Sequence, residues 1–252
     1  MSTLIASAIL MVAPVPVNAQ TSEVKEKPPM YTYVSSFAMP RPKWADLEKQ
    51  NASDAKVFDK ALSAGTLVAY GDDTVVVHSD GGYTHDTFWS SMSMAGVLGV
   101  LEELHKSGTT VSPVLSSATK HEDDLLVSHY YNWKSGAYKG GYLHEAFYRL
   151  KPDAPDGAIE LISKSFVVPL FEKLLADGTV LEYEIDEEQI HSHAPGAFWL
   201  VYITRTAAAL DKVDAAVGEA FKASALVGPA LGSMVDESKH ADVLSRSTGV
   251  YK

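Results

Sequence analysis

The sequence predicts an α+β fold in which one β-α-β-β-α-β unit occurs twice along the chain. The first observation is an internal repeat, because the segment 58–66 (FDKALSAGT) returns as 171–179 (FEKLLADGT). Shorter matches follow in the same order: His78-Ser79 with His191-Ser192, and Phe88-Trp89 with Phe198-Trp199. Matches that keep their order along a chain indicate a duplicated structural unit. The second observation is the spacing of apolar residues, which predicts strands and helices in the same order in both halves.

The first repeat is expected over residues 31–133. Alternating aromatic residues predict a strand over 31–39, and helical spacing of apolar residues predicts a helix from Trp44 to Ala64 that stops at Gly65. The remaining elements are a strand over 66–79 with a bulge near Gly71, a strand at Phe88-Trp89, a helix from Met94 to Gly108, and a strand over 125–133.

The turn-rich segment 134–141 is expected to link this unit to the second repeat, residues 142–252. Its elements are a strand near 146–150, a helix over 159–174 with a kink at Pro169, a strand over 179–191, a strand over 198–205, a helix over 210–221 and a short strand near 243–250. In the strand 179–191, Tyr183 and Ile185 alternate with four acidic residues, so we expect the apolar side to face the interior.

The composition narrows the class of protein. The formal net charge of −11 argues against nucleic acid and anionic lipid as partners, because both need a basic surface. The chain has no cysteine, which excludes thiol catalysis and thiolate metal sites and is compatible with export. A neutral or cationic small molecule is the partner that remains, and a further homo-oligomer stays open.

The N-terminus has the pattern of a targeting segment. Residues 1–19 hold an apolar stretch too short to span a membrane, followed by Val17-Asn18-Ala19 as a cleavage site. This predicts a cleaved signal peptide, a secreted or periplasmic protein, and no membrane insertion after cleavage; a retained apolar anchor is the alternative. Residues 20–30 are polar and proline-bearing and predict a flexible linker.

The β-α-β-β-α-β order is ferredoxin-like, and it leaves one face of each four-stranded sheet to be covered. Two copies can cover each other, which predicts two tandem ferredoxin-like repeats packed as a pseudo-dimeric α/β barrel. In this element order and duplication, over roughly residues 31–252, the chain resembles the dimeric α/β-barrel superfamily in its fused form. That resemblance implies cofactor-independent monooxygenases, haem proteins such as chlorite dismutase-like enzymes, isomerases, or proteins without known activity, so it does not select one function.

Duplicated histidines are the candidate catalytic residues. His78 and His191 close equivalent strands, and His193 follows two residues after His191, a spacing that two metal ligands can share. A strand-end histidine bonded to backbone is the structural alternative. His121 and His240 each precede an aspartate by two residues, which suits a general base oriented by a carboxylate. The alternative for these two segments is a capped helical turn.

An aromatic cluster supplies the candidate ligand-binding residues. His129, Tyr131 and Trp133 alternate along one predicted strand, and Tyr148 and Arg149 close another. Such a set can line a pocket with stacking surfaces and one anion partner, whereas the alternative is packing between the repeats.

Three functions follow, and the sequence leaves open whether the chain is an enzyme. The first is an exported small-molecule-binding barrel, such as a cofactor-independent oxygenase or isomerase with an aromatic-lined pocket. The second is a non-enzymatic binding or sensing protein of the envelope, and the third is a haem or metal protein. No motif identifies a cofactor.

Overall fold

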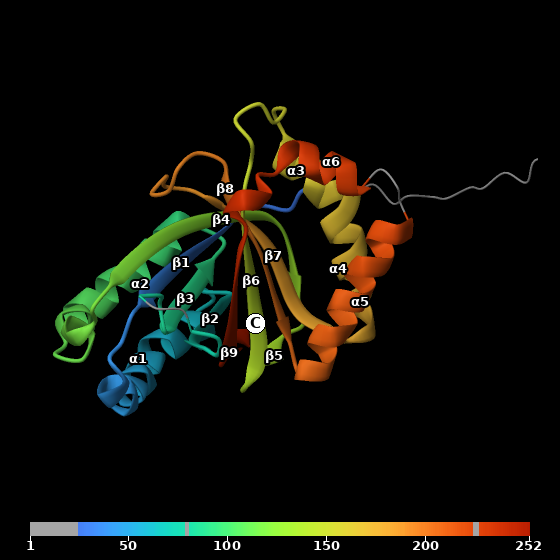
Figure 1. Cartoon of the computed structure of the whole chain (residues 1–252). Coiled ribbons are helices and arrows are strands. Elements are labelled where there is room, and N and C mark those ends of the chain that lie inside the picture. Colours follow the sequence, from blue (N-terminus) through green and yellow to red (C-terminus); the bar gives the residue numbers. More distant parts are fainter. Residues whose placement is uncertain (1–24, 79–80, 224–226) are drawn as a thin grey trace, which may run out of the picture.

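The protein forms a closed β-barrel with helices on its outside (Figure 1). The structure is a computed structural model and describes residues 25–78, 81–223 and 227–252. The expected signal peptide, residues 1–19, lies outside the described residues, as do residues 20–24 of the expected linker. Of that linker, residues 25–29 have no regular structure, and the first strand begins at Met30.

Eight antiparallel strands build the barrel. Their order around it is β3-β1-β4-β7-β8-β6-β9-β2, and pairing of β2 with β3 closes the sheet. The strands are β1 (Met30–Phe37), β2 (Ala69–Val75), β3 (His85–Ser91), β4 (His121–Trp133), β6 (Gly141–Arg149), β7 (Val180–Glu188), β8 (Ala197–Thr204) and β9 (Ala241–Ser247). Two short strands, β5 (Gly136–Ala137) and β10 (Val250–Tyr251), pair beside β2.

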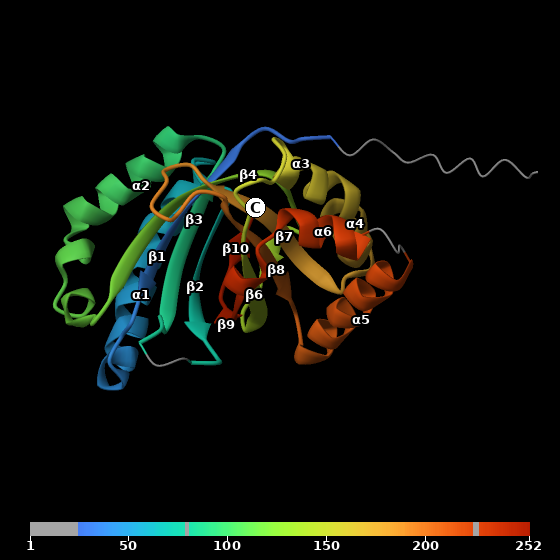
Figure 2. The same cartoon turned by 45° about the horizontal axis from the view of Figure 1, so that its top comes forward.

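The helices fall into two groups on opposite sides of the barrel (Figures 1 and 2). Helices α1 (Trp44–Ser63) and α2 (Met94–Ser107) cover the strands of the first half. The second group consists of α3 (Ala158–Ile162), the π-helical turn η4 (Ser163–Val167), α4 (Val168–Asp177), α5 (Ala207–Ala223) and α6 (Val227–Met234). Short 3₁₀ turns include η2 (Thr109–Val111), η3 (Leu115–Ser117) and η5 (Glu237–Lys239). None of the helices within the described residues combines the length and apolar character that a bilayer crossing requires.

Each group of helices packs an apolar stripe onto the outer face of the sheet. In the first half, Phe58 of α1 and Val97 of α2 pack against Trp89 of β3. In the second half, Phe171 of α4 and Val213 of α5 pack against strands β7 and β8. Full burial of such a side chain contributes about 1.5–3 kcal/mol, so both layers stabilise the fold.

The two faces of β7 differ from expectation. Tyr183 and Ile185 pack on the helices, as their alternation predicts, but the acidic residues between them do not face solvent. Instead, they lie inside the barrel; they are Glu182, Glu184, Asp186 and Glu188, all buried. The expectation that only the apolar side is interior was therefore wrong, because closure of the sheet buries both faces.

Several element boundaries also need correction. Strand β2 is shorter than expected and pairs with β3 without a bulge at Gly71, and residues 79–80 lie outside the described residues. Strand β4 starts at His121, so the capped turn considered there does not form. In the second half, η5 is capped by Asp236, whose side chain accepts a hydrogen bond from the Ser238 backbone N–H. The irregular turn η4 ends at Val167, two residues before Pro169, which has no N–H to donate.

Candidate functional site

Strand β4 separates two cavities. Because side chains alternate along a strand, His121 and Asp123 point outward to the helices of the first half, whereas Glu122 and Asp124 point into the barrel. The outer cavity, which we call the sheet–helix cavity, has a volume of about 710 Å³. The inner one, the barrel cavity, has a volume of about 630 Å³.

The sheet–helix cavity contains a linked group of three polar side chains. Ser35 of β1 donates a hydrogen bond from its hydroxyl to Asp123 Oδ1 (2.6 Å) and lies 3.0 Å from His121 Nε2. His121 Nε2 is also 3.0 Å from Asp123 Oδ1. Pairing of β1 with β4 places Ser35 directly beside Asp123, so the sheet register fixes the group.

This geometry assigns the tautomer of His121. Its Nε2 faces a carboxylate oxygen and a hydroxyl that already donates to that carboxylate, so Nε2 carries the proton. Nδ1 is then the nitrogen with a free lone pair and can accept a proton from a bound molecule. The His121 ring is held by stacking on Phe37, with ring centroids 4.6 Å apart.

Aromatic side chains form a wall of the same cavity. Tyr33 stacks on Trp89 with ring centroids 4.5 Å apart, and Trp89 donates its indole N–H to the Val97 carbonyl of α2. Burial, and then the nearby Asp123 carboxylate, raise the pKa of Tyr33 above its usual range. Tyr33 therefore stays a neutral phenol, able to donate a hydrogen bond and to stack on a flat ligand.

Two further acidic groups lie on the helix side and the sheet floor of the sheet–helix cavity. Asp54 of α1 accepts a hydrogen bond from the Thr109 hydroxyl (2.6 Å), which ties α1 to η2. Asp72 of β2 accepts from the Thr87 hydroxyl (2.8 Å), and burial raises the pKa of Asp72 to about 6. The cavity is thus mixed, with aromatic walls and a few placed polar groups, as small-molecule sites commonly are.

The corresponding layer in the second half is filled by side chains. Phe171, Tyr183 and Tyr202 are buried there in one contiguous apolar cluster. His240 lies at its edge, where its ring stacks on Tyr148 and its Nε2 is 3.2 Å from Asp242. The His-x-Asp pair is therefore close in both halves, but both residues of the first pair line the sheet–helix cavity, whereas Asp242 of the second pair lines the barrel cavity.

Eight carboxyl groups line the barrel cavity among apolar side chains. The acidic residues that line it are Asp73, Asp86, Glu122, Asp124, Glu145, Glu184, Asp186 and Asp242. Burial raises the pKa of Asp186 to about 7 and that of Asp86 to about 6. Burial, with repulsion from neighbouring carboxylates, also raises the pKa of Glu145 and Glu184. Much of this cluster is therefore neutral at mildly acidic pH.

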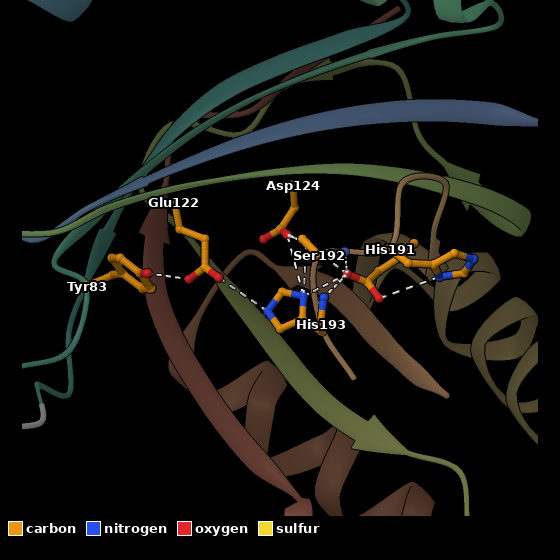
Figure 3. Close-up of polar contacts among 7 residues, drawn as sticks. Tyr83, Glu122, Asp124, His191, Ser192 and His193 are labelled. Atoms are coloured by element: carbon orange, nitrogen blue, oxygen red, sulfur yellow. Dashed lines mark hydrogen bonds and ion pairs between the residues drawn. The ribbon is translucent and has the colours of Figure 1, made fainter. Parts of the chain in front are cut away.

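At the mouth of the barrel cavity, His193 meets two carboxylates (Figure 3). His193 Nε2 lies 3.5 Å from Glu122 Oε1, and its Nδ1 lies 3.6 Å from Asp124 Oδ1. Glu188 holds the loop that carries His193, because its Oε1 accepts from the His193 backbone N–H and lies 2.8 Å from Nδ1. Tyr83 donates its hydroxyl proton to Glu122 from the opposite side.

The structure places the other candidate histidines apart from these groups. The His78 side chain is at the exposed rim of the barrel cavity, 5.7 Å from the Trp44 ring. His191 is largely exposed, with its Nδ1 3.9 Å from Glu188 Oε2, and it points away from His193 (Figure 3). His191 and His193 therefore do not share one ligand cluster.

The aromatic candidates pack between elements. Tyr131 stacks on Trp133 with ring centroids 5.6 Å apart, and the Tyr131 hydroxyl donates to the Pro28 carbonyl. The His129 ring nitrogen lies 2.9 Å from Glu26, while Tyr148 stacks on Phe198 and His240. Of the predicted ligand-binding residues, only Arg149 lines either cavity of the described structure; its guanidinium lies over the Phe147 ring.

The sequence reasoning missed Ser35, Tyr33 and the carboxylates of the barrel. The alternation of acidic residues in 180–188 was visible, but an antiparallel strand with a polar face is usually solvated on that face. Ser35 has no motif and becomes significant only through its pairing with β4.

Haem does not fit the sheet–helix cavity. The lining of the sheet–helix cavity includes Asp54, Asp72 and Asp123 but no lysine or arginine to pair with the haem propionates. In the second half, the layer between sheet and helices is closed by buried side chains.

The comparisons with known proteins identify the fold. No family model and no curated protein match the chain by sequence. Among solved structures, a Lactobacillus acidophilus protein proposed to be a monooxygenase superposes with a TM-score of 0.66 at 11% identity, covering 89% of this chain and 97% of its own. A Fusobacterium nucleatum protein, also proposed to be a monooxygenase, gives 0.63 at 6% identity, covering 90% and 95%. An anthrone oxidase-like protein gives 0.52 at 9% identity, covering 90% and 94%.

These likenesses extend over nearly the full length of each neighbour, and they agree with the closed antiparallel sheet. The chain therefore has the dimeric α/β-barrel fold, as the resemblance implied. At such low identity the likeness concerns the fold alone.

Proposed function

We propose that the protein binds a flat, neutral small molecule in the sheet–helix cavity of its first half and oxidises it with O₂ without a cofactor. The observation that carries the proposal is the juxtaposition of the Ser35–His121–Asp123 group with the Tyr33–Trp89 stack in one cavity of about 710 Å³. The proposed monooxygenases and the anthrone oxidase-like protein among the structural neighbours support the reaction class.

The chemistry assigns a role to each group. His121 Nδ1 removes a proton from an acidic C–H of the substrate, and Asp123 stabilises the imidazolium that forms. The Tyr33 phenol donates a hydrogen bond to the oxyanion of the enolate. The enolate carbon then reduces O₂: one oxygen atom becomes the carbonyl of the product, and the other leaves as water with the two hydrogens of the original CH₂ group.

Without O₂, the same base could return the proton to another carbon, which would make the protein an isomerase. The two reactions share the first step and differ in oxygen consumption. A protein that only binds its ligand would show neither reaction.

Anthrone is a suitable first probe, because it is flat and has an acidic CH₂ group between aromatic rings. Oxygen uptake is measured with an electrode for the wild type, for His121→Gln, and for His240→Gln as the matched control from the second half. We expect uptake above the uncatalysed rate for the wild type and His240→Gln, and a loss of about 10²–10⁴-fold for His121→Gln.

Ligand-stabilised melting by anthrone without oxygen uptake or isomerised product would contradict the enzyme and favour the binding protein. Equal rates for His121→Gln and wild type would contradict the assignment of the base. Melting curves with and without anthrone separate binding from turnover in each variant.

We further propose that the two halves are tandem ferredoxin-like repeats that form a pseudo-dimer in one chain. The strand orders β2-β3-β1-β4 and β7-β8-β6-β9 support this, because equivalent strands occupy equivalent places in both halves. Export to the periplasm or the medium is also part of the proposal. N-terminal sequencing of the mature protein tests it, with Gln20 as the expected first residue.

A further inference from the structure

A second group of side chains, unrelated to the sheet–helix cavity, gathers at the mouth of the barrel. It combines one imidazole with two carboxylates, and these come from strand β4 and from the loop between β7 and β8. One ligand atom from each of Glu122, Asp124 and His193 lies within 4.8 Å of the others. This mixture of a nitrogen and two oxygen ligands is more specific than a patch of acidic residues.

The distance between His193 Nε2 and Glu122 suits a shared ion, and Asp124 approaches the same ring from its Nδ1 side at 3.6 Å. Two ligands on a tetrahedral ion with bonds of about 2.1 Å lie about 3.4 Å apart. His193 Nε2 and Glu122 Oε1 are 3.5 Å apart. Asp124 Oδ1 accepts the Ser192 hydroxyl at 2.9 Å, which orients its carboxylate at the same opening (Figure 3).

The imidazole is held in the orientation that a metal ligand needs. Glu188 is buried and its Oε1 lies 2.8 Å from His193 Nδ1, so Nδ1–H donates to the carboxylate and Nε2 keeps its lone pair. A carboxylate on the far nitrogen of a ligating histidine is the usual arrangement around protein-bound metals. Glu188 also accepts both backbone N–H groups of Ser192 and His193, which fixes the loop.

An independent observation comes from the barrel cavity behind this mouth, where a buried carboxylate oxygen is left without a partner. Asp73 is 2% exposed and lines the cavity, yet its Oδ1 has no hydrogen-bond partner among the described residues. An unpartnered buried carboxylate oxygen is costly unless a proton or a cation satisfies it. Of the lining residues, only Arg149 carries a permanent positive charge, against eight carboxyl groups.

We propose that the barrel mouth binds one divalent transition-metal ion through Glu122, Asp124 and His193, with Glu188 as the positioning residue for His193. The imidazole ligand favours Zn²⁺ or Co²⁺ over Ca²⁺ and Mg²⁺, which prefer oxygen ligands alone. The site is separate from the sheet–helix cavity, because strand β4 lies between them. Its test is therefore independent of the proposed oxygenase activity.

The test uses untagged full-length protein freed of metal by a chelator and titrated with Zn²⁺ by calorimetry. We expect one ion per chain in the wild type and a loss of affinity of more than about tenfold in His193→Gln and Asp124→Asn. His191→Gln is the matched control, since this exposed histidine lies two residues away and should leave the affinity unchanged. Glu188→Gln should weaken binding by about 10–100-fold while the stoichiometry stays at one.

Titration with Co²⁺ adds a direct readout of the ligands, because the visible bands of bound Co²⁺ report its coordination. We expect these bands in the wild type and in His191→Gln, and altered bands in Asp124→Asn. Absence of binding to the wild type overturns the proposal, as does an equal loss in His191→Gln and His193→Gln. If His193→Gln fails to fold by circular dichroism, Asp124→Asn and Glu122→Gln decide: wild-type affinity in both overturns the proposal.

Discussion

Asp123 and Asp124 are consecutive in strand β4, but their carboxylates open into different cavities. Asp123 accepts the Ser35 hydroxyl in the sheet–helix cavity, whereas Asp124 accepts the Ser192 hydroxyl at the mouth of the barrel. The alternation of side chains along a strand makes this separation necessary. One strand thus supplies the base of the proposed oxygenase on one face and two ligands of the proposed metal site on the other.

The first prediction uses this separation. Asp123→Asn should lower anthrone oxidation by about 10-fold or more, because the imidazolium of His121 loses its carboxylate, and should leave the Zn²⁺ affinity unchanged. Asp124→Asn should instead lower the Zn²⁺ affinity and leave anthrone oxidation unchanged. Oxygen uptake and calorimetry on both variants check the prediction, and loss of both properties in either variant would show that the two sites are coupled.

The second prediction concerns pH. Burial raises the pKa of Asp186 to about 7 from an ordinary value of 3.8. Between these values the folded state holds a proton that the unfolded state has released, so the free energy of unfolding falls as pH rises from about 4 to about 7. Asp186→Asn removes this pH-dependent fall in the free energy of unfolding. The amide oxygen of the introduced side chain can still accept a hydrogen bond from the Ser128 hydroxyl.

We therefore expect Asp186→Asn and wild type to have similar stability near pH 4.5, and the variant to be more stable by about 1 kcal/mol or more above pH 7.5. Urea unfolding at both pH values, in chelator, measures the difference. Asp153→Asn on an exposed loop is the control and should change nothing at either pH. A variant that is less stable than wild type at high pH would show that the ionised carboxylate is stabilising in the barrel.

The third prediction concerns the space around a glycine in the barrel wall. A Cβ on Gly71 would lie 2.7 Å from Phe88 Cε1 and 2.8 Å from the Gly249 Cα, and the second contact is with backbone. Gly71→Ala should therefore destabilise the protein by about 1–3 kcal/mol. Gly99→Ala is the matched control, since a Cβ there meets nothing within 4 Å and α2 should gain up to about 1 kcal/mol. Chemical denaturation measures both, and equal stabilities would contradict the prediction.

The sequence predicted the architecture better than the site, for physical reasons. The helix that ends at Gly108 was predictable because glycine reaches the left-handed conformation there, with φ of 83°. The start of β4 at His121 was not, because Thr119 and Asp123 have the side chains of a helix cap, and pairing with β1 overrides that local preference.

The functional groups depend on the register between distant strands. His121 was recognised as a base beside an aspartate, but Ser35 joins it only because β1 and β4 pair with Ser35 opposite Asp123. Likewise, His193 was grouped with His191 by spacing, whereas the barrel brings it to Glu122 and Asp124. Local spacing identifies which residues have suitable chemistry, and closure of the barrel decides which of them meet.

The last prediction tests whether the sheet–helix cavity is the ligand site. Ala118 lines this cavity. Ala118→Phe would place a ring in the cavity while Ser35, His121 and Asp123 themselves stay unchanged. In Ala118→Phe, we expect anthrone to raise the melting temperature by only a small fraction of the increase seen with the wild type. The melting temperature of the protein without anthrone should change little. Val201→Phe, which fills the barrel cavity instead, is the control for added bulk and should keep the anthrone effect if it folds. Because a ligand stabilises only the state that binds it, an unchanged anthrone shift in Ala118→Phe would place the ligand elsewhere on the protein.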